Sequence, residues 1–345
     1  MANSKHGIQK RLTSLDAFRG FAIALMIFVN NTEGNTYSQL QHASWNGWTI
    51  ADTVFPLFLW ITGLAMVFSL GNRLKESDSK KEILFHILKR VVILFILGVV
   101  LNAFPFFQLS AVRIPGILQR VAVCYFIASA IYLFSGIKGV GISTIILLSI
   151  YWILIKLFGD TFPRSVDIFL LNGHLWSNGF NFDPEGIVST IAATTSVLFG
   201  ILSGYLLKIT NNENKKVYLL VIVGCILIVL GQIMNVWFPI NKNLWTSSYA
   251  VFMAGISSLV FSLFYYCIER KGWQQLFQLF TVYGMNPLLL YMLSSLFTSA
   301  LLAIPGFFLR ITDEKNAMVL FALANVVLFY IVANFLYRRK WFVKI

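Results

Sequence analysis

The chain has 345 residues, of which 58% are hydrophobic and only 12% are charged, and its mean hydropathy is +0.75. A soluble domain carries about 25% charged residues, so this composition excludes an ordinary soluble enzyme. The net charge of +13 does not indicate nucleic-acid binding, because the basic residues gather in the connections on one side of a predicted membrane protein. No nucleic-acid-binding module is visible.

Apolar stretches long enough to cross a bilayer as helices recur along the chain. They predict an all-α polytopic membrane protein, a single domain over residues 1–345 with about ten transmembrane helices. The spans are expected at residues 14–31, 50–70, 83–104, 116–135, 138–158, 186–209, 216–236, 246–268, 274–302 and 316–337. If both termini are cytoplasmic, few basic residues face outward: Arg113, Lys156, Arg164, Lys242, Arg310 and Lys315. This asymmetry follows the positive-inside rule and predicts cytoplasmic termini.

The first predicted span carries two ionisable residues, Asp16 and Arg19, which can face each other at i and i+3. A charge inside a bilayer is costly unless it is paired or lies in a wet cavity. The two residues are therefore either a self-compensating pair near the cytoplasmic interface or a site where Arg19 meets an anionic ligand. Because these charges interrupt the apolar run and no small-residue cleavage site follows it, the segment is expected to be a permanent helix rather than a signal peptide.

The stretch HASWNGWTIADTVFPLFLWITG begins at His42 and leads into the second span. Imidazole is well suited to proton transfer near neutral pH, although a histidine held in an interfacial loop is the simpler interpretation. Trp45 and Trp48 suit the membrane interface, and Asn46 adds an amide beside them. Asp52 lies near the start of a helix, where it suits the helix dipole and could also orient His42 or balance another cation.

Further polar residues follow along the chain. Arg120, within RIPGILQRVAVCYF, is expected to face the bundle interior and to pair with Asp52 or Glu185. The longest outer connection, about residues 159–185, is rich in turn sequences and is expected to fold as a lid or a short re-entrant piece. It ends in FDPEGIVST, where Asp183 and Glu185 suit an acidic helix start as well as a ligand site.

In NKNLWTSSY, Lys242 and Trp245 could form a cation site beside an aromatic ring, or could be a snorkelling lysine and an interfacial anchor. The cysteines lie inside predicted spans without disulfide or metal spacing and are interpreted as small core residues: Cys124, Cys225 and Cys267. No P-loop, HExxH, GxSxG or dinucleotide fingerprint occurs, and the histidines are too scattered for a metal site.

Several motifs, in order, resemble the heparan-α-glucosaminide N-acetyltransferase family. They are RLTSLDAFRGFAIALMIFVNN, HASWNGWTIADTVFPLFLWITG, RIPGILQRVAVCYF, FDPEGIVSTIAATTSVLFGILSG and NKNLWTSSYAVFMAG, from Arg11 to about Gly255, with YGMNPLLLY after them. That family comprises a lysosomal transmembrane acetyltransferase and bacterial relatives, and it transfers acetyl from acetyl-CoA to the amino group of a terminal glucosamine. Because RLTSLD lies near the start of this chain with no luminal domain before it, we expect a bacterial relative in the cytoplasmic (inner) membrane.

The resemblance implies a transmembrane acyltransferase-type bundle and roles for individual residues. The motif histidine of the family corresponds to His42, which would act as general base or, less simply, as an acetyl carrier. The asparagine closing the first helix corresponds to Asn30, with Asn31 as the alternative because this loop is about one residue longer. Asn30 would stabilise charge in the tetrahedral intermediate. Asp52 would set the tautomer of His42 or balance a cation.

Other residues in these motifs are expected to hold the substrates: Asp16, Arg19, Trp45, Asn46, Arg120, Asp183, Glu185, Lys242, Trp245 and Asn286. Acetyl-CoA is made in the cytoplasm and His42 is predicted outside, so the pantetheine arm would thread the helix bundle. The expected partners are acetyl-CoA as donor substrate, an amino-sugar acceptor and the lipid bilayer, with a homodimer suggested by the resemblance and no metal.

Two other functions are compatible with the sequence. A secondary transporter of a sugar or cell-wall fragment would fit ten spans with charges near the midplane, although the paired broken helices and repeats common in transporters are not found. An O-acetyltransferase acting on a polysaccharide or lipid hydroxyl would keep the chemistry and change only the acceptor.

Overall fold

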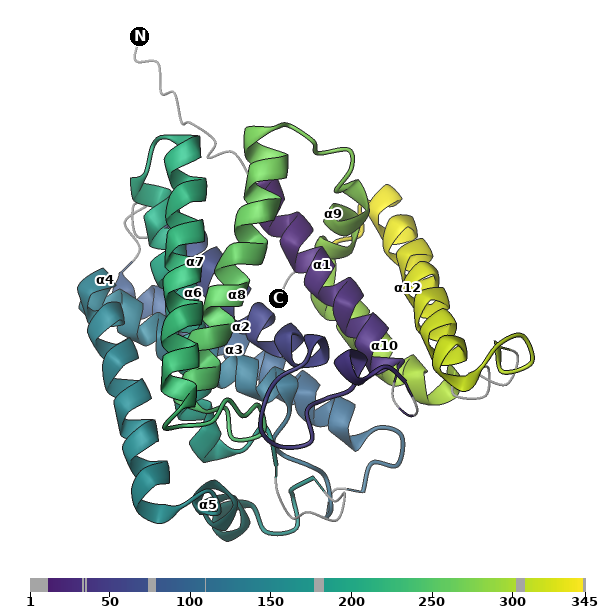
Figure 1. Ribbon diagram of the computed structural model, residues 1–345, viewed down its shortest axis with the longest axis horizontal. Coiled ribbons are helices and arrows are strands. Elements are labelled where there is room, and N and C mark those ends of the chain that lie inside the picture. The colour runs from purple at the N-terminus through teal and green to yellow at the C-terminus, as the bar shows by residue number, and fades with distance from the viewer. Residues whose placement is uncertain are drawn as a thin grey trace.

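The computed structural model describes residues 12–32, 34, 36–73, 79–108, 110–176, 183–301 and 308–343, and the regular structure in these ranges is entirely helical (Figure 1). The long helices are α1 (Thr13–Asn30), α2 (Ile50–Arg73), α3 (Lys80–Ala103), α4 (Ile117–Phe158), α6 (Ile187–Ile209), α7 (Glu213–Asn235), α8 (Ser247–Tyr265) and α12 (Glu314–Arg338). The shorter elements are η1 (Ser38–Leu40), α5 (Phe162–Leu171), the π-helical turn η2 (Tyr266–Arg270), α9 (Gln278–Gly284) and α10 (Pro287–Leu301).

The helices confirm the expected class of polytopic helical membrane protein. Within the described residues, eight helices are long and apolar enough to cross a membrane, or up to nine if α9 and α10 form one bent span. α4 has 42 residues and would be about 63 Å long as one rod, roughly twice the hydrocarbon core of a bilayer. It is broken at Gly136, whose φ of 63° and ψ of −166° are not helical, at the point where the sequence predicts two separate spans. Ten crossings and cytoplasmic termini stay predictions.

The predicted ninth span, residues 274–302, is wrong as a single helix. α9 and α10 meet at an angle of 83°, with Asn286 and Pro287 at the bend. Proline lacks a backbone donor and disfavours helical backbone in the residue before it, which explains the break. The Asn286 amide donates to the carbonyl of Trp341 at 2.9 Å and accepts from the amide of Val343 at 2.9 Å. The segment after α12 therefore folds back onto the bend.

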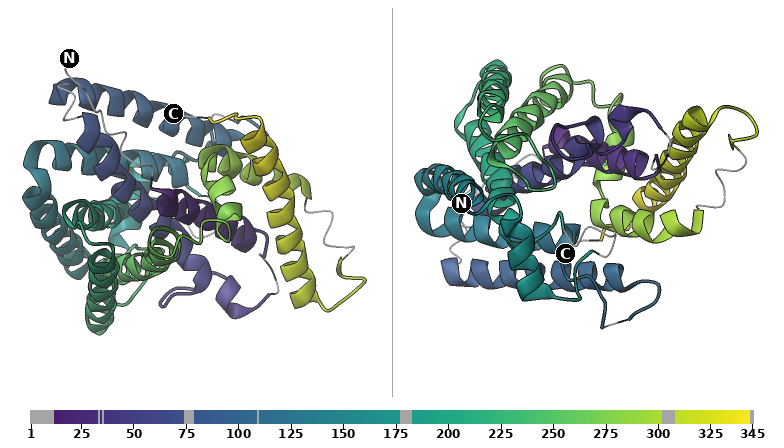
Figure 2. Two further views of the ribbon diagram at one scale, coloured as in Figure 1. Left: turned by 90° about the horizontal axis from the view of Figure 1, so that it is seen from above. Right: turned by 60° about the horizontal axis from the view of Figure 1, so that its bottom comes forward.

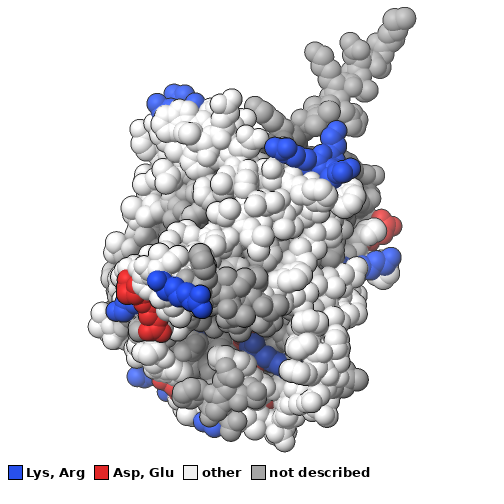
Figure 3. Space-filling model, turned by 90° about the vertical axis from the view of Figure 1, so that its right-hand side faces the viewer, with Lys and Arg blue, Asp and Glu red and all other residues white. Residues whose placement is uncertain are grey.

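Four helices form the inside of the bundle and four surround them. In α1, α2, α6 and α8, 67–72% of the spanning residues are buried, against 17–28% in α3, α4, α7 and α12. Figure 2 shows the yellow α12 at one margin of the molecule and the teal α4 at the other. On the face in Figure 3, most of the surface of the described residues carries no charge, and their charged groups form a few separate patches. An uncharged surface of this kind suits contact with lipid, where ionisable groups are costly.

Glycines bring the inner helices into backbone contact. A Cβ at Gly63 of α2 would lie 1.9 Å from a carbonyl oxygen of α6, and one at Gly200 of α6 would lie 2.0 Å from a carbonyl oxygen of α2. α1 and α9 meet in the same way through Gly20, at 1.7 Å, and Gly284, at 1.9 Å. Small residues allow such close approach between membrane helices. These contacts fix the position of α2, which carries Asp52 near its start.

The connection expected as a lid contains the helix α5, which packs against α6 and α4 at one end of the bundle (Figure 1). Residues 177–182, in the second half of that connection, lie outside the described residues. Among the cysteines, Cys124 and Cys267 are buried as expected. Cys225 is exposed on α7, one of the surrounding helices, so the interpretation of this residue as part of the core is wrong.

Candidate active site

The candidate site starts from a buried carboxylate at the beginning of α2. Thr49 and Asp52 form a T-x-x-D pattern, which is typical of a helix start because the acidic side chain can reach back to the first residue. Asp52 Oδ2 accepts hydrogen bonds from the backbone amide and the hydroxyl of Thr49, at 3.1 and 3.0 Å, and from the amide of Ala43 at 3.1 Å. The Asp52 residue is 0% exposed. Its carboxylate therefore ties the preceding loop to the helix.

His42 lies on this loop and uses the second oxygen of the same carboxylate. His42 Nδ1 is 2.8 Å from Asp52 Oδ1, and the histidine side chain is 50% exposed while that of Asp52 is 1% exposed. When Nδ1–H donates to Asp52, Nε2 carries the lone pair. A half-exposed imidazole oriented by a buried carboxylate is suited to act as a general base.

Lys242 brings a positive charge to the pair from a position 200 residues later in the chain. Its Nζ lies 3.2 Å from Asp52 Oδ1, and 2.9 and 3.3 Å from His42 Nδ1 and Nε2. The Lys242 side chain is only 18% exposed. It therefore turns toward the histidine and the carboxylate, which does not support the interpretation of Lys242 as a snorkelling residue.

The connection between α7 and α8 holds Lys242 in place through buried contacts. Trp245 has a φ of 53° and is 1% exposed, and its indole donates to the Ser196 hydroxyl at 3.3 Å. Its ring packs edge-on against Phe55 and Tyr249, with centroids 5.1 and 5.3 Å away. A left-handed backbone at a bulky residue persists only where the surroundings impose it. The interpretation of Trp245 as an interfacial anchor is therefore wrong, because the ring is part of the core.

Direct hydrogen bonds dock the His42 loop on the α7–α8 connection. Asn241 donates to the Asn46 side chain at 3.2 Å, and the amide of Gly47 donates to the carbonyl of Ile240 at 2.7 Å. The Tyr249 hydroxyl, from α8, donates to the carbonyl of Asp52 at 2.7 Å. Sequence reasoning found Asn46 but missed Asn241, which no spacing singles out. The His42 loop and the α7–α8 connection, which are far apart in the chain, therefore together position the side chains of His42, Asp52 and Lys242.

The aromatic residues of the His42 loop are partly exposed. Trp45 is 40% exposed and Trp48 is 37% exposed. The ring of Trp48 packs against Phe252 of α8, with centroids 5.1 Å apart. The role of these side chains as interfacial anchors stays a prediction.

The two candidate asparagines at the end of α1 differ in their contacts. Asn31 is buried, and its Nδ2 donates to the carbonyl of Ile27 at 2.7 Å. Asn30 is partly exposed, and no hydrogen bond joins its side chain to another described residue. Nor does any hydrogen bond link either asparagine to His42 within those residues. Asn30 keeps its amide available, whereas Asn31 uses its donor group inside the helix.

A second polar cluster lies around the start of α6, and Arg113 is its centre. Arg113 Nε and Nη2 donate to the two oxygens of Asp183, at 2.8 and 2.5 Å, and Nη2 also contacts Glu185. Burial alone would lower the pKa of Arg113, but the hydrogen bond and charge of Asp183 and the charge of Glu185 outweigh it and raise that pKa. Sequence reasoning placed Arg113 only in an outer loop. In the structure, Asp183 and Glu185 therefore join the start of α6 to the connection between α3 and α4 that carries Arg113.

The expected carboxylate partners of Arg120 are wrong, because Glu185 pairs with Arg113 and Asp52 pairs with His42 and Lys242. Arg120 is 2% exposed, and its Nη2 donates to the carbonyl of Gly186 at 3.1 Å and to the Ser189 hydroxyl. Its guanidinium lies 5.2 Å from the centre of the Trp245 ring. Arg120 therefore faces the bundle interior, as expected, but behind the aromatic residues that support the site.

The charges in α1 agree with the self-compensating interpretation. Arg19 Nη1 lies 3.3 Å from Asp16 Oδ1, and the amide of Ser14 donates to Glu269 of η2 at 2.9 Å. These residues lie near the beginning of α1, roughly 20 Å along the helix from Asn30 at the rise of an α-helix. They do not join the group around His42. Asn286 does not join this group either, because it is hydrogen-bonded to the segment after α12.

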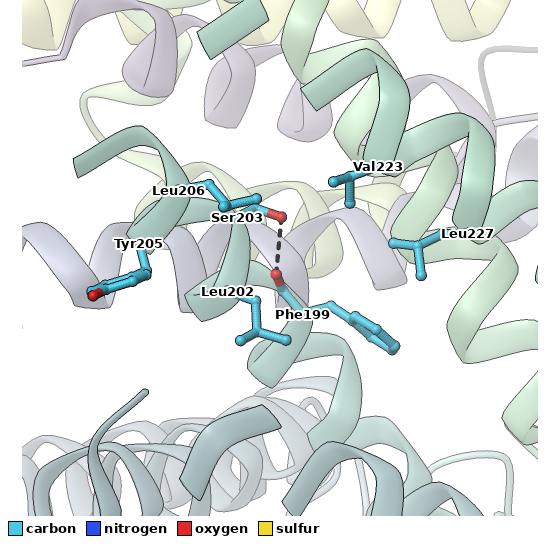
Figure 4. Close-up of a pocket in the computed structure, with 7 residues that line it drawn as sticks. All are labelled: Phe199, Leu202, Ser203, Tyr205, Leu206, Val223 and Leu227. Atoms are coloured by element: carbon cyan, nitrogen blue, oxygen red, sulfur yellow. Dashed lines mark hydrogen bonds between the residues drawn. The ribbon is translucent and has the colours of Figure 1, made fainter. Parts of the chain in front are cut away.

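Two grooves in the described part of the molecule lie away from His42. One, of about 300 Å³, lies between α6 and α7 and is lined by the residues in Figure 4, where the only drawn hydrogen bond runs from Ser203 to the carbonyl of Phe199 within α6. The other, of about 480 Å³, lies between α4 and the end of α7 and contains Trp152 and Lys156. Both expose mostly apolar surface. Neither groove is lined by His42, Asp52 or Lys242, so the contacts of those residues define the candidate site.

Fold and site together define an integral-membrane protein with an oriented histidine at one end of its helix bundle. A family model described as "Heparan-alpha-glucosaminide N-acetyltransferase, catalytic" matches residues 11–177, which include His42 and Asp52. Heparan-alpha-glucosaminide N-acetyltransferases of Mus musculus and Homo sapiens are each 28% identical to this chain over 406 aligned residues, covering 97% of it. Over residues 11–177 the chain is therefore similar to the catalytic part of this family. It spans 60% of the length of those two relatives.

Proposed function

We propose that this protein is an integral-membrane acetyltransferase that moves acetyl from acetyl-CoA to the amino group of a glucosamine-type sugar. The observation that carries the proposal is the hydrogen bond of 2.8 Å between His42 Nδ1 and Asp52 Oδ1, in a chain whose relatives are named as N-acetyltransferases. An acetyltransferase needs a base at the acceptor, and an oriented, half-exposed imidazole is suited to that role.

The chemistry needs one proton acceptor and one group that stabilises negative charge. The acceptor amine attacks the thioester carbon, a C–N bond forms, and His42 Nε2 takes a proton from the nitrogen. The C–S bond then breaks, and the proton returns from His42 to the CoA sulfur, so CoA leaves as the thiol. Asp52 holds the imidazole with Nδ1–H directed toward its carboxylate. The side-chain amide of Asn30, which has no hydrogen-bonding partner among the described residues, suits the oxygen of the tetrahedral intermediate.

The remaining parts of the proposal concern sidedness and assembly. His42 lies at the end of α2 that is expected outside, whereas acetyl-CoA is a cytoplasmic metabolite. The pantetheine arm would therefore thread the bundle, with basic residues of the cytoplasmic connections near the nucleotide phosphates. A homodimer, which the resemblance suggests, is also part of the proposal.

Acetyl transfer by the purified, detergent-solubilised protein tests the proposal. With acetyl-CoA and glucosamine, the wild-type protein is expected to release free CoA and to form N-acetylglucosamine, detected as thiol and by mass. His42→Ala is expected to lower the rate by about 10²–10⁴-fold, the usual contribution of a general base. His86→Ala is the matched control, because His86 is exposed on α3. Wild-type activity in His42→Ala would remove the central role of His42.

Two alternatives predict different products. An O-acetyltransferase would release CoA and acetylate a polysaccharide or lipid hydroxyl in place of glucosamine. A secondary transporter is favoured by one observation, the bent pair α9 and α10, since broken helices often form transport sites. In this structure the amide at that bend, Asn286, binds the protein's own segment. Flux of a sugar into proteoliposomes without acetyl-CoA would support the transporter.

A further inference from the structure

The side chains of His42 and Lys242 both approach the same oxygen atom of the Asp52 carboxylate. Asp52 Oδ1 lies 2.8 Å from His42 Nδ1 and 3.2 Å from Lys242 Nζ. Lys242 also approaches both nitrogens of the imidazole, at 2.9 and 3.3 Å. The carboxylate is 1% exposed and the lysine side chain is 18% exposed, so solvent screens the two charges less than it would at the surface.

A buried carboxylate beside an imidazole has two opposite effects. It orients the ring, which a general base needs, but it also stabilises the protonated imidazolium, which cannot accept a further proton. In the structure the ammonium group of Lys242 offsets the charge of Asp52 at the same oxygen. With Lys242 cationic and His42 neutral, the three groups together carry no net charge.

We infer that Lys242 is a positioning residue that offsets the charge of Asp52 beside His42, so that the carboxylate orients the imidazole without favouring its protonated form. The role in catalysis rests on the proposed acetyl transfer, whereas the effect of Lys242 on protonation of His42 does not. Lys242 acts through the other two residues. It opposes the imidazolium directly by its charge and indirectly by balancing Asp52.

Within the described residues, the ionisable groups facing this cluster come from three elements. α2 supplies Asp52 and the α7–α8 connection supplies Lys242. α8 supplies Tyr249, whose hydroxyl donates to the backbone carbonyl of Asp52. Arg120 of α4 lies behind Trp245, over its ring. The lysine is therefore the cation in direct contact with both the imidazole and its carboxylate.

Removal of the Lys242 charge has a defined consequence for the pH dependence of His42. In Lys242→Met, Asp52 is no longer balanced, so the imidazolium becomes more stable and His42 becomes neutral only at higher pH. Close charges commonly move such a transition by about 1–3 pH units. Asp52→Asn removes the opposite charge and moves the transition to lower pH. The double variant lacks both charges and lies between the two single variants.

Carbethoxylation by diethyl pyrocarbonate measures this transition without requiring activity, because the reagent modifies the neutral imidazole. The rate is followed between pH 5 and 9 by mass spectrometry of the peptide that contains His42. The peptide with His174 is the internal reference, since that ring binds the carbonyl of Val112 away from the cluster. Lys156→Met is the matched control, because it removes another lysine expected on the outer side. Lys242→Gln is the second variant, which loses the charge and keeps a hydrogen-bond donor for Asp52.

The expected result is a midpoint for His42 that rises by about one pH unit or more in Lys242→Met and Lys242→Gln and is unchanged in Lys156→Met. The acidic limit of acetyl transfer would shift by the same amount, with activity recovered at high pH. Unchanged midpoints in both Lys242 variants would overturn the inference. If the midpoints shift but the wild-type protein transfers no acetyl group, the proposed function fails while the charge balance stands. If transfer occurs and falls equally at every pH without a shift, Lys242 has only a structural role.

Discussion

At the residue scale, the buried carboxylates of this protein differ in how their oxygens are satisfied. Both oxygens of Asp52 and both oxygens of Asp183 have hydrogen-bonding partners. Asp167, in α5, accepts from the amide of Ile187 at 2.8 Å through Oδ1, but its Oδ2 has no partner among the described residues. Asp167 is 1% exposed. Burial therefore raises the pKa of Asp167 to about 6.

This raised pKa makes the stability of the protein depend on pH. A carboxylate whose pKa is higher in the folded state stabilises the fold fully below its unfolded pKa, and this contribution is lost as pH rises toward about 6. Asparagine cannot ionise, so Asp167→Asn keeps the stability that the wild-type protein loses when Asp167 becomes charged. The variant is expected to be more stable than wild type at pH 7.5, by at most about 3 kcal/mol. At pH 4 the difference should largely disappear. Thermal unfolding in detergent at the two pH values measures it, and an equal difference at both would contradict this explanation.

The contacts of Asp183 predict that its replacement by asparagine lowers the stability of the protein, whereas the same replacement of Asp167 raises it. Asp183→Asn removes the charge that pairs with Arg113, and among the described residues only Glu185 is then left to balance this mostly buried guanidinium. Breaking a buried ion pair on one side costs about 3–5 kcal/mol. We expect a lower midpoint of thermal unfolding at all pH values near neutrality. Glu213→Gln is the control, since its side chain is 43% exposed and such a pair with Lys216 contributes little. Equal small effects in both variants would show that the Arg113 cluster is not a structural unit.

At the scale of elements, the position of the site depends on how closely α2 and α6 pack. Gly63 and Gly200 place the backbone of each helix against the other, and a side chain at either position would overlap a carbonyl oxygen. α2 carries Asp52 at its start, and α6 carries Ser196, which accepts from the indole of Trp245. A shift of these helices would therefore change both supports of the site.

Gly63→Val is expected to force α2 and α6 apart and to lower the yield of folded, monodisperse protein. Gly141→Val is the matched control, because a Cβ there meets no atom within 4 Å. Size-exclusion chromatography and thermal unfolding of the two variants, purified in parallel, measure the effect. Normal behaviour of Gly63→Val would mean that the helices tolerate separation and that the glycine contact is not required.

Local sequence signals predicted the elements better than the contacts between them. Asp52 is expected near a helix start because it suits the helix dipole, and α2 begins at Ile50; the break of α4 at Gly136 lies between the predicted spans 116–135 and 138–158. The bend before Pro287 also has a local signal, the Asn–Pro pair, which the prediction of one continuous span overlooked. The pairing of Arg113 with Asp183 and the docking of Asn241 on Asn46 join residues far apart in the chain. No periodicity encodes such pairs.

At the scale of the whole molecule, the main open prediction is the path of the chain through the membrane. The expected path has ten crossings, with the break at Gly136 turning α4 back at the cytoplasmic side. In a background without native cysteines, Lys138→Cys should then react with an impermeant maleimide from the same side as Asn212→Cys. Asn172→Cys, after α5, should react from the opposite side. Labelling of position 138 together with position 172 would contradict two crossings by α4.

The proposed reaction joins the two sides of that membrane, because the donor is cytoplasmic and His42 is expected outside. The most direct test uses proteoliposomes of known orientation, with acetyl-CoA only on the side of the N-terminus and glucosamine only on the side of His42. We expect N-acetylglucosamine on the His42 side and free CoA on the N-terminal side for the wild-type protein, and neither product for His42→Ala. Product formation only when both substrates share one side, or equal product from both proteins, would contradict transfer through the bundle to His42.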